Sequence, residues 1–328
     1  MLLGNYSTFI LGNGISCFEL VTTRYYVGNT MESENMENLL FILLFTLPIF
    51  IPLGFFAFIQ FRLSQKGRLP IDYKRMQRVP GFSLIVELKS LQFDMGSFSG
   101  LAVAVGMLPF AQAGIFQLFG KSYSTPYFAV MVFITTSTQV YLVYRIIKSF
   151  KKLQHVRLGL EAEWAVAGEL NQINDPNVTV FHDLQGDNFN IDHVVTSPNG
   201  ILVIETKGRR KPNKGERNKS FQVEAIENTL HFPHYVDNQT IPQAQRQTKW
   251  LKEYLNKAAG ESSLVISAIV VVPGWYVTMK TKPEVLTWPL KNLSQNYRNG
   301  LKQSLSPEQL RRVNHQLATL SLRNTDLF

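Results

Sequence analysis

The hydrophobic positions follow two different patterns along the chain. Up to residue 144 they form three long runs without a charged side chain, at 39–61, 98–119 and 122–144. A helix needs about 20 apolar residues to cross the hydrocarbon core of a bilayer, so each run predicts a transmembrane helix. Beyond residue 150 the hydrophobic residues are spaced as in the helices and strands of a globular domain.

The three runs differ in strength. The first is strongly apolar and contains Pro48 and Pro52, which neighbouring helices in a bundle tolerate. The second carries Gln112 and Gln117, so a buried or re-entrant segment is an alternative there. The third begins and ends near tyrosines, which are typical of the membrane–water interface.

The second half of the chain predicts a small mixed α/β sheet with helices packed on it. The expected order is a helix at 158–173, a strand at 177–184, a hairpin at 191–208, a helix at 241–260 and a strand at 264–274. A closing helix at 307–320 follows, with Ser306 as its N-cap and Pro307 at its first position.

Lysine and arginine predict the orientation. Charged residues make up only 17% of the chain, and its net charge is +9. Seven cations lie between the first two runs and only Lys121 lies between the second and third. By the positive-inside rule, the 62–97 loop and everything after Tyr144 are cytoplasmic. We therefore expect a multi-pass protein of the cytoplasmic membrane.

These patterns divide the chain into four parts. An extracytoplasmic tail at 1–37 precedes the transmembrane region at 38–150. A cytoplasmic domain at 151–275 and a C-terminal extension at 276–328 complete the chain. The single cysteine, Cys17, excludes an intramolecular disulfide framework and a cysteine-rich metal site.

Charged residues interrupt the otherwise apolar hairpin "IDHVVTSPNGILVIETKG" at 191–208. Glu205 and Lys207 are two positions apart on its second strand, so their side chains share one face. A carboxylate buried without a partner is expensive. These charges need either solvent, as on an exposed edge strand, or a ligand.

The turn at 197–200 leaves two registers open. If the loop is limited to its two central residues, Asp192 lies opposite Glu205; if Gly200 forms a bulge, Asp192 faces Thr206 instead. Two carboxylates in direct register repel each other, so such a pair favours a cation between them. Mg²⁺, or Mn²⁺, takes carboxylate oxygens and binds substrate phosphates.

The cytoplasmic half resembles the nuclease-related domain (NERD) family, a branch of the PD-(D/E)XK restriction-endonuclease-like fold. Five elements carry the resemblance over about 155–275, in the family's order. They are Gly-x-x-Ala-Glu at 159–163, Ile-Asp-His at 191–193, Ile-Glu-Thr-Lys at 204–207, Pro-x-x-Gln at 242–245 and "AIVVVP" at 268–273.

The resemblance implies a role for five residues. Asp192 and Glu205 correspond to metal ligands, and Glu163 to the helix acid that supports the metal site. Lys207 corresponds to the catalytic lysine, which assists hydrolysis at phosphorus. Gln245 corresponds to the polar residue that closes the site.

Several of these residues have alternative readings. Glu161 is the neighbouring alternative to Glu163, although the family's spacing favours the latter. Glu163 and Gln245 are also compatible with ordinary exposed helix positions. His193 lies on the face opposite to Asp192, which is more typical of a core histidine than of a ligand.

The chain departs from the family in the segment "GRRKPNKGERNK" at 208–219, where a short turn is usual. Its six cations are Arg209, Arg210, Lys211, Lys214, Arg217 and Lys219. We expect this arm to contact nucleic-acid phosphates; a solvated loop and anionic lipid headgroups are the alternatives. No aromatic residue interrupts it, so it offers no stacking platform of its own.

Together these features predict a membrane-anchored, metal-dependent nuclease that hydrolyses nucleic acid, DNA in the first place, at the cytoplasmic face. Cleavage of both strands would favour a homodimer. The alternative is a membrane-tethered binding module that keeps the fold without turnover. A sensor or transporter ranks lower, because the apolar runs contain no ionisable residue.

Overall fold

The structure is a computed structural model. It describes residues 54–55, 58–59, 61–62, 72–118, 120, 124–212, 221–260, 264–281 and 283–323. The expected tail at 1–37 and most of the expected span at 39–61 lie outside these residues. The chain divides into two units, one of which draws on Met1–Leu69 with Ser99–Tyr144 and the other on Pro70–Phe98 with Arg145–Phe328.

Two helices, α2 (Phe82–Leu118) and α3 (Thr125–Leu170), are long and apolar enough to cross a membrane. Between Ser99 and Tyr144 they pair as an antiparallel hairpin, in which the Gln139 side-chain amide donates to the Ala102 carbonyl at 2.6 Å. Large apolar side chains such as Phe110 and Phe133 are more than 70% exposed there. Two of the three expected spans thus coincide with apolar helices.

Both helices extend further than the sequence predicted. Helix α2 begins at Phe82, so residues 82–97 are helical and not part of a loop. Helix α3 has 46 residues and continues to Leu170, so the expected third span and the next expected helix are one. At 1.5 Å per residue α3 is about 69 Å long, more than twice the thickness of a bilayer core. Only its apolar first part, up to Tyr144, suits lipid.

The larger sheet of the second unit has five strands in the order β1-β2-β3-β7-β9. Their bounds are β1 Thr179–Gln185, β2 Asn190–Ser197, β3 Gly200–Thr206, β7 Ile266–Val272 and β9 Leu286–Pro289. The first three strands pair antiparallel, whereas β7 pairs parallel with both β3 and β9. The mixed α/β class expected from the sequence is confirmed.

The register of the β2–β3 hairpin is the one with a two-residue loop. Ser197 pairs with Gly200 and His193 pairs with Ile204. Gly200 has a φ of +130°, and a Cβ there would lie 2.8 Å from the Gln303 carbonyl oxygen. By this register Asp192 lies opposite Glu205, so the bulged alternative is excluded.

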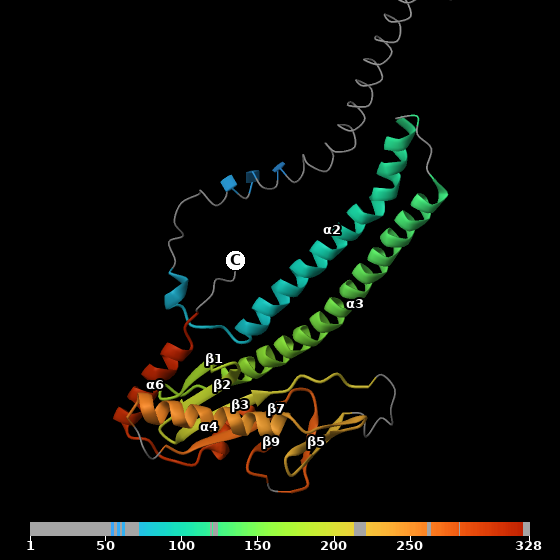
Figure 1. Ribbon diagram of the computed structural model, residues 1–328. Helices are drawn as coiled ribbons and strands as arrows, with labels where there is room; N and C mark the ends of the chain where they lie inside the picture. The colour runs from blue at the N-terminus through green and yellow to red at the C-terminus, as the bar shows by residue number, and fades with distance from the viewer. Residues whose placement is uncertain are drawn as a thin grey trace, which may run out of the picture. The chain divides into compact units, whose positions relative to one another are not determined.

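Helices cover both faces of this sheet (Figure 1). Ile201 and Val203 of β3 pack with buried residues of α4 (Thr240–Ala258) and α6 (Pro307–Leu320). Leu202 and Ile204 point the other way and pack with the last turns of α3. The two faces alternate along β3 as a strand's period of two requires.

A second, four-stranded sheet was not foreseen. Its order is β6-β5-β4-β8, with β4 Gln222–Ile226, β5 Thr229–Phe232, β6 Tyr235–Asp237 and β8 Tyr276–Met279. The short helices are α5 (Leu293–Asn296), η1 (Tyr73–Arg75) and η2 (Tyr297–Gly300). The predicted closing helix and its N-cap are confirmed: Ser306 caps α6 in a capping box with Gln309.

Candidate active site

A pocket of about 480 Å³ lies where β3 ends, within the second unit. Three acids from different elements line it: Glu163 of α3, Asp192 of β2 and Glu205 of β3. Lys207, directly after β3, lines it too. The structure therefore gathers four of the five residues that the sequence placed in a catalytic site.

The two strand acids are fixed by the hairpin register. Asp192 and Glu205 project from the same face of the sheet. Asp192 lies two positions from Val194, and Glu205 lies two positions from Val203. Both valines pack in the core under α4. The backbone N–H of Thr206 donates to Asp192 Oδ2 at 2.7 Å. This hydrogen bond links β2 and β3 next to the pocket.

Glu205 is almost fully buried, with 3% of its surface exposed. Its Oε1 accepts a 2.8 Å hydrogen bond from the side-chain amide of Gln243 on α4. Its Oε2 is buried and has no hydrogen-bond partner among the described residues. One oxygen of this carboxylate is thus available to a ligand inside the pocket.

Glu163 reaches the pocket from α3, nineteen positions beyond the apolar part of that helix. It is 7% exposed, and its Oε2 has no partner in the part of the chain that the structure describes. Glu161, the neighbouring alternative, instead forms an ion pair with Arg157 at 2.9 Å on the helix surface. The helix thus directs Glu163 inward and Glu161 outward.

Burial changes the protonation of all three acids. It raises the pKa of Glu205 to about 7, although the nearby Lys207 opposes the shift. It raises the pKa of Glu163 to about 8, with further repulsion from Asp183 and Glu205. The pKa of Asp192 lies well above its usual range because of burial and the charges of Glu205 and Glu163. Such clustered, raised pKa values are typical of functional sites.

One family comparison matches this region. Residues 158–273 match the family model of the nuclease-related domain (NERD). No curated protein and no solved structure matches the chain. The NERD region begins within α3, shortly before Glu163, and ends directly after β7, so it contains every acid of the pocket.

The basic arm of the NERD domain is described only in part. Arg209 pairs with Asp237 at 2.7 Å, and Arg210 donates to the Gln154 side chain at 2.7 Å. Lys211 lies 5.8 Å from the centre of the Phe221 ring. Lys214, Arg217 and Lys219 lie outside the described residues. Arg209 and Arg210 line the pocket.

The NERD domain turns a different glutamine toward its acids than the sequence indicated. Gln245 donates to Asn228 and Glu284, both at 3.4 Å, on another side of α4. Gln243 binds Glu205, and Gln247 donates to the Asn190 carbonyl at the start of β2. These two are four positions apart and share one helix face. In the structure, the burial of Ala244, Gln247 and Leu251 marks the inner side of α4.

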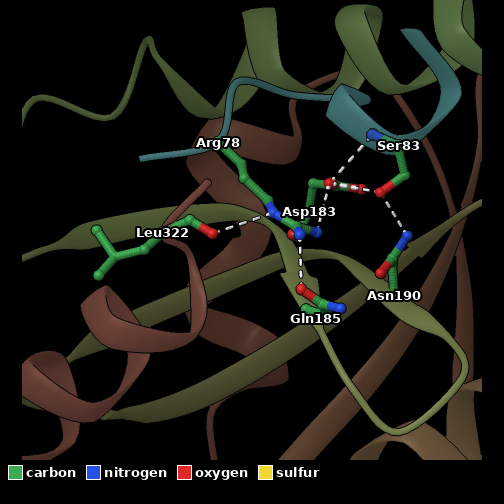
Figure 2. Close-up of polar contacts among 6 residues, drawn as sticks. All are labelled: Arg78, Ser83, Asp183, Gln185, Asn190 and Leu322. Atoms are coloured by element: carbon green, nitrogen blue, oxygen red, sulfur yellow. Dashed lines mark hydrogen bonds and ion pairs between the residues drawn. The ribbon is translucent and has the colours of Figure 1, made fainter. Parts of the chain in front are cut away.

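A buried ion pair beside the NERD acids was missed from the sequence. Arg78 lies 3.2 Å from Asp183, and both side chains are at most 6% exposed. Figure 2 shows this Arg78 cluster, in which the Ser83 hydroxyl also donates to Asp183 and Arg78 donates to Gln185 and to the Leu322 carbonyl. Asp183 lies on β1 between the residues of the register pairs His182–His193 and Leu184–Ile191, at the position opposite Asp192.

The Arg78 cluster joins residues outside the matched region to residues within it. Arg78 precedes α2, more than 70 positions before the match begins. Gly81, three positions later, has a φ of +68°, and a Cβ there would lie 3.5 Å from Glu163 Oε2. The Trp164 indole N–H also donates to the Pro80 carbonyl at 3.1 Å. Residues 78–83 therefore pack against the acid-bearing part of α3.

The acids of the NERD domain suit a hard divalent cation in their chemistry. Carboxylate oxygens are the ligands that Mg²⁺ and Mn²⁺ prefer, and Glu163 and Glu205 each present a buried oxygen without a partner among the described residues. No three His, Cys, Asp or Glu side chains in the described ranges are already gathered as a metal-binding group. Asp192, Glu205 and Glu163 are the candidate ligands.

Proposed function

We propose that this protein is a metal-dependent phosphodiesterase that hydrolyses nucleic acid, DNA in the first place. The observation that carries the proposal is the pocket in which Glu163, Asp192 and Glu205 meet Lys207. Buried carboxylates with raised pKa values and unpartnered oxygens are costly to the fold. A cluster of them next to a lysine is the arrangement expected when a protein gives up stability for a function.

The chain's own residues have separate tasks in this mechanism. Asp192, Glu205 and Glu163 would hold the cation, while Gln243 fixes the orientation of Glu205 through its hydrogen bond. When bound, Mg²⁺ or Mn²⁺ lowers the pKa of water and stabilises negative charge on phosphorus. Lys207 orients the attacking water and donates hydrogen bonds to the developing charge. Arg209 and Arg210 at the pocket contact neighbouring phosphates.

The topology of the larger sheet supports a PD-(D/E)XK-like assignment. Acids lie on two adjacent antiparallel strands, β2 and β3, and the lysine follows β3 directly. The third strand, β7, pairs parallel with β3. A helix acid, Glu163, completes the set from α3. The resemblance of the sequence to the NERD family implied this arrangement of two strand acids, a lysine and a helix acid.

We further propose that the apolar helices anchor the enzyme in a membrane with the NERD domain on the cytoplasmic side. Apolar side chains between residues 99 and 144 are largely exposed, including Val103, Phe110 and Phe133 at 66% or more. Apolar surface of this extent requires a nonaqueous surrounding. The lysines and arginines that flank the helices support the orientation.

The test uses the full chain in detergent, because residues 78–83 belong to the folded unit. Wild type should cleave plasmid or single-stranded DNA with Mg²⁺ or Mn²⁺ and lose the activity in EDTA. Lys207→Ala should lower the cleavage rate by at least about 100-fold, the range of a positioned acid–base or electrostatic group. The rate is measured by gel electrophoresis of labelled substrate.

The matched control is Lys249→Ala, which removes an exposed lysine of α4 that does not line this pocket. It should leave the rate unchanged. Equal rates for wild type and Lys207→Ala would refute the catalytic assignment. Salt-sensitive DNA binding that survives Asp192→Ala and needs no divalent cation would then identify a non-catalytic binding module.

A further inference from the structure

One wall of the pocket is formed by an aromatic ring and a guanidinium from outside the acid-bearing strands. Tyr235, at the start of β6, and Arg209 both line it. Tyr235 is 43% exposed, and the Arg209 guanidinium carbon lies 5.7 Å from the centre of its ring. The basic segment itself has no aromatic residue between Arg209 and Lys219, so the fold adds one from the second sheet.

The ring of Tyr235 is held rigidly from behind. It stacks on Phe232 with ring centres 4.8 Å apart and planes at 8°. Phe232 in turn contacts the buried Trp275 edge-to-face at 4.9 Å. The Trp275 indole N–H donates to the Arg209 carbonyl at 3.1 Å. The contacts of Phe232 and Trp275 therefore position both the Tyr235 ring and the backbone of Arg209.

The guanidinium of Arg209 is fixed as firmly as the ring. It donates to Asp237 at 2.7 Å. Asp237 also accepts the backbone N–H groups of Gln239 and Thr240 and the Thr240 hydroxyl. An arginine locked in this way presents a preorganised planar cation, which binds phosphate and stacks on nucleobases.

The size of the pocket limits what can lie against this wall. At about 480 Å³, it falls within the range of sites for single small molecules, about 300–1,000 Å³. This volume suits one nucleotide with its phosphate. A half-exposed aromatic ring beside a cation is the device by which proteins bind unstacked bases without sequence preference.

We propose that Tyr235 and Arg209 form a binding site for one unpaired nucleotide, so that the preferred substrate is a single strand or a splayed end and not an intact duplex. This proposal rests on the proposed function and names the class of substrate for that reaction. Tyr235 stacks on the base and Arg209 holds the adjacent phosphate. DNA and RNA strands share this chemistry.

Binding is measured by fluorescence anisotropy with the full chain in detergent, and every variant carries Lys207→Ala to prevent turnover. The probes are labelled single strands of DNA and of RNA, a DNA duplex of equal length, and a DNA single strand composed of abasic units. Tyr235→Ala should weaken binding of the DNA single strand about tenfold, within the range for loss of one base–aromatic stack. It should not change binding of the abasic strand.

Two controls keep the result interpretable. Tyr235→Phe keeps the ring and should bind the single strand as tightly as the parent. Tyr276→Ala removes a ring that is 62% exposed but does not line the pocket, so it should also have no effect. A thermal melt of each variant identifies any loss of folding, in which case Tyr235→Leu replaces Tyr235→Ala.

The outcomes separate this inference from the proposed function. Duplex binding as tight as single-strand binding, or equal affinity of Tyr235→Ala and its parent for the single strand, overturns the nucleotide site even if the wild type cleaves DNA. A tenfold effect with the DNA strand alone assigns the site to DNA, and with both strands to any unpaired nucleotide. The binding assay still tests the nucleotide site if the wild type does not cleave DNA.

Discussion

Individual acids carry most of the functional information in this chain. Asp192 and Glu205 interrupt strands whose other positions are almost all buried. Their common face followed from strand parity, and the two-residue turn determined that they lie opposite each other. Their raised pKa values mean that, without a cation, part of the cluster holds protons near neutral pH.

These protons make the stability of the metal-free protein depend on pH. The pKa of Glu163 is raised from 4.5 to about 8 and that of Glu205 from 4.5 to about 7. Above pH 4.5 the unfolded chain releases protons that the folded chain keeps, so the free energy of unfolding falls as the pH rises to about 8. We expect the melting temperature in EDTA to drop by roughly 5 °C or more between pH 5.5 and 8.5.

Mg²⁺ should reverse this loss, and more so at pH 8.5, because a cation binds the ionised carboxylates of the folded state. Glu163→Gln should flatten the pH dependence, since its amide does not titrate. The measurement is a thermal melt of the full chain at each pH with EDTA or Mg²⁺. A melting temperature that rises with pH in EDTA would contradict the raised pKa values.

At the scale of elements, the sequence best predicted those that are bounded by clear turn or cap residues. The β2–β3 hairpin and the α6 cap were readable because turn and cap residues are local signals. The strands β4 to β6 were missed, although Val223, Ala225, Leu230 and Phe232 alternate with polar residues. Strands of three to five residues beside a basic segment carry too few positions for a periodicity to stand out.

The choice of glutamine on α4 shows the same limit within a helix. A motif places a residue in sequence, whereas a helix rotates by 100° per residue. Gln245 lies two positions from both Gln243 and Gln247 and therefore faces away from them. Only the burial of neighbouring positions in the structure distinguishes the three.

The end of β3 approaches α3 so closely that only glycine fits after Lys207. A Cβ on Gly208 would lie 2.7 Å from the Leu158 carbonyl oxygen and 3.0 Å from the Ala162 Cβ. Gly208→Ala should therefore push the strand end away from the helix and destabilise the fold by about 1–3 kcal/mol. Denaturant unfolding of the full chain measures the change.

Gly168→Ala is the matched control for this substitution. Gly168 also lies in the folded unit, in α3, but a Cβ there would meet nothing within 4 Å. Alanine is favoured over glycine inside a helix, so this variant should gain about 0.5–1 kcal/mol. If both variants shift stability in the same direction, the close approach at Gly208 is not the cause.

At the scale of the whole molecule, the folded unit is discontinuous in sequence. It combines Pro70–Phe98 with Arg145–Phe328, and the Arg78 cluster joins the two stretches. No local pattern predicts this arrangement, because the partners Arg78 and Asp183 are 105 positions apart and neither belongs to a motif. A boundary at residue 150 was the natural inference from composition, and it separates Arg78 from its partner.

Removing Arg78 should destabilise the protein more than removing any exposed arginine. Arg78→Met leaves Asp183 buried without its ion-pair partner, which costs about 3–5 kcal/mol. Arg75→Met is the matched control, since the Arg75 side chain is 88% exposed and pairs with the exposed Asp72; its effect should stay within about 0.5 kcal/mol. Equal unfolding midpoints for the two variants in urea would show that the ion pair does not stabilise the fold.

The Arg78 cluster also constrains how the chain is made. Arg78 donates to the carbonyl of Leu322, 244 positions later, while the apolar hairpin between Ser99 and Tyr144 leaves the ribosome in between. The cluster can therefore be complete only when translation is nearly finished, although Asp183 and Gln185, two other partners of Arg78, are made earlier. The apolar hairpin is therefore made before the Arg78 cluster can be completed. In the proposed membrane-anchored nuclease, the chain would thus enter its membrane before its active site is fully formed.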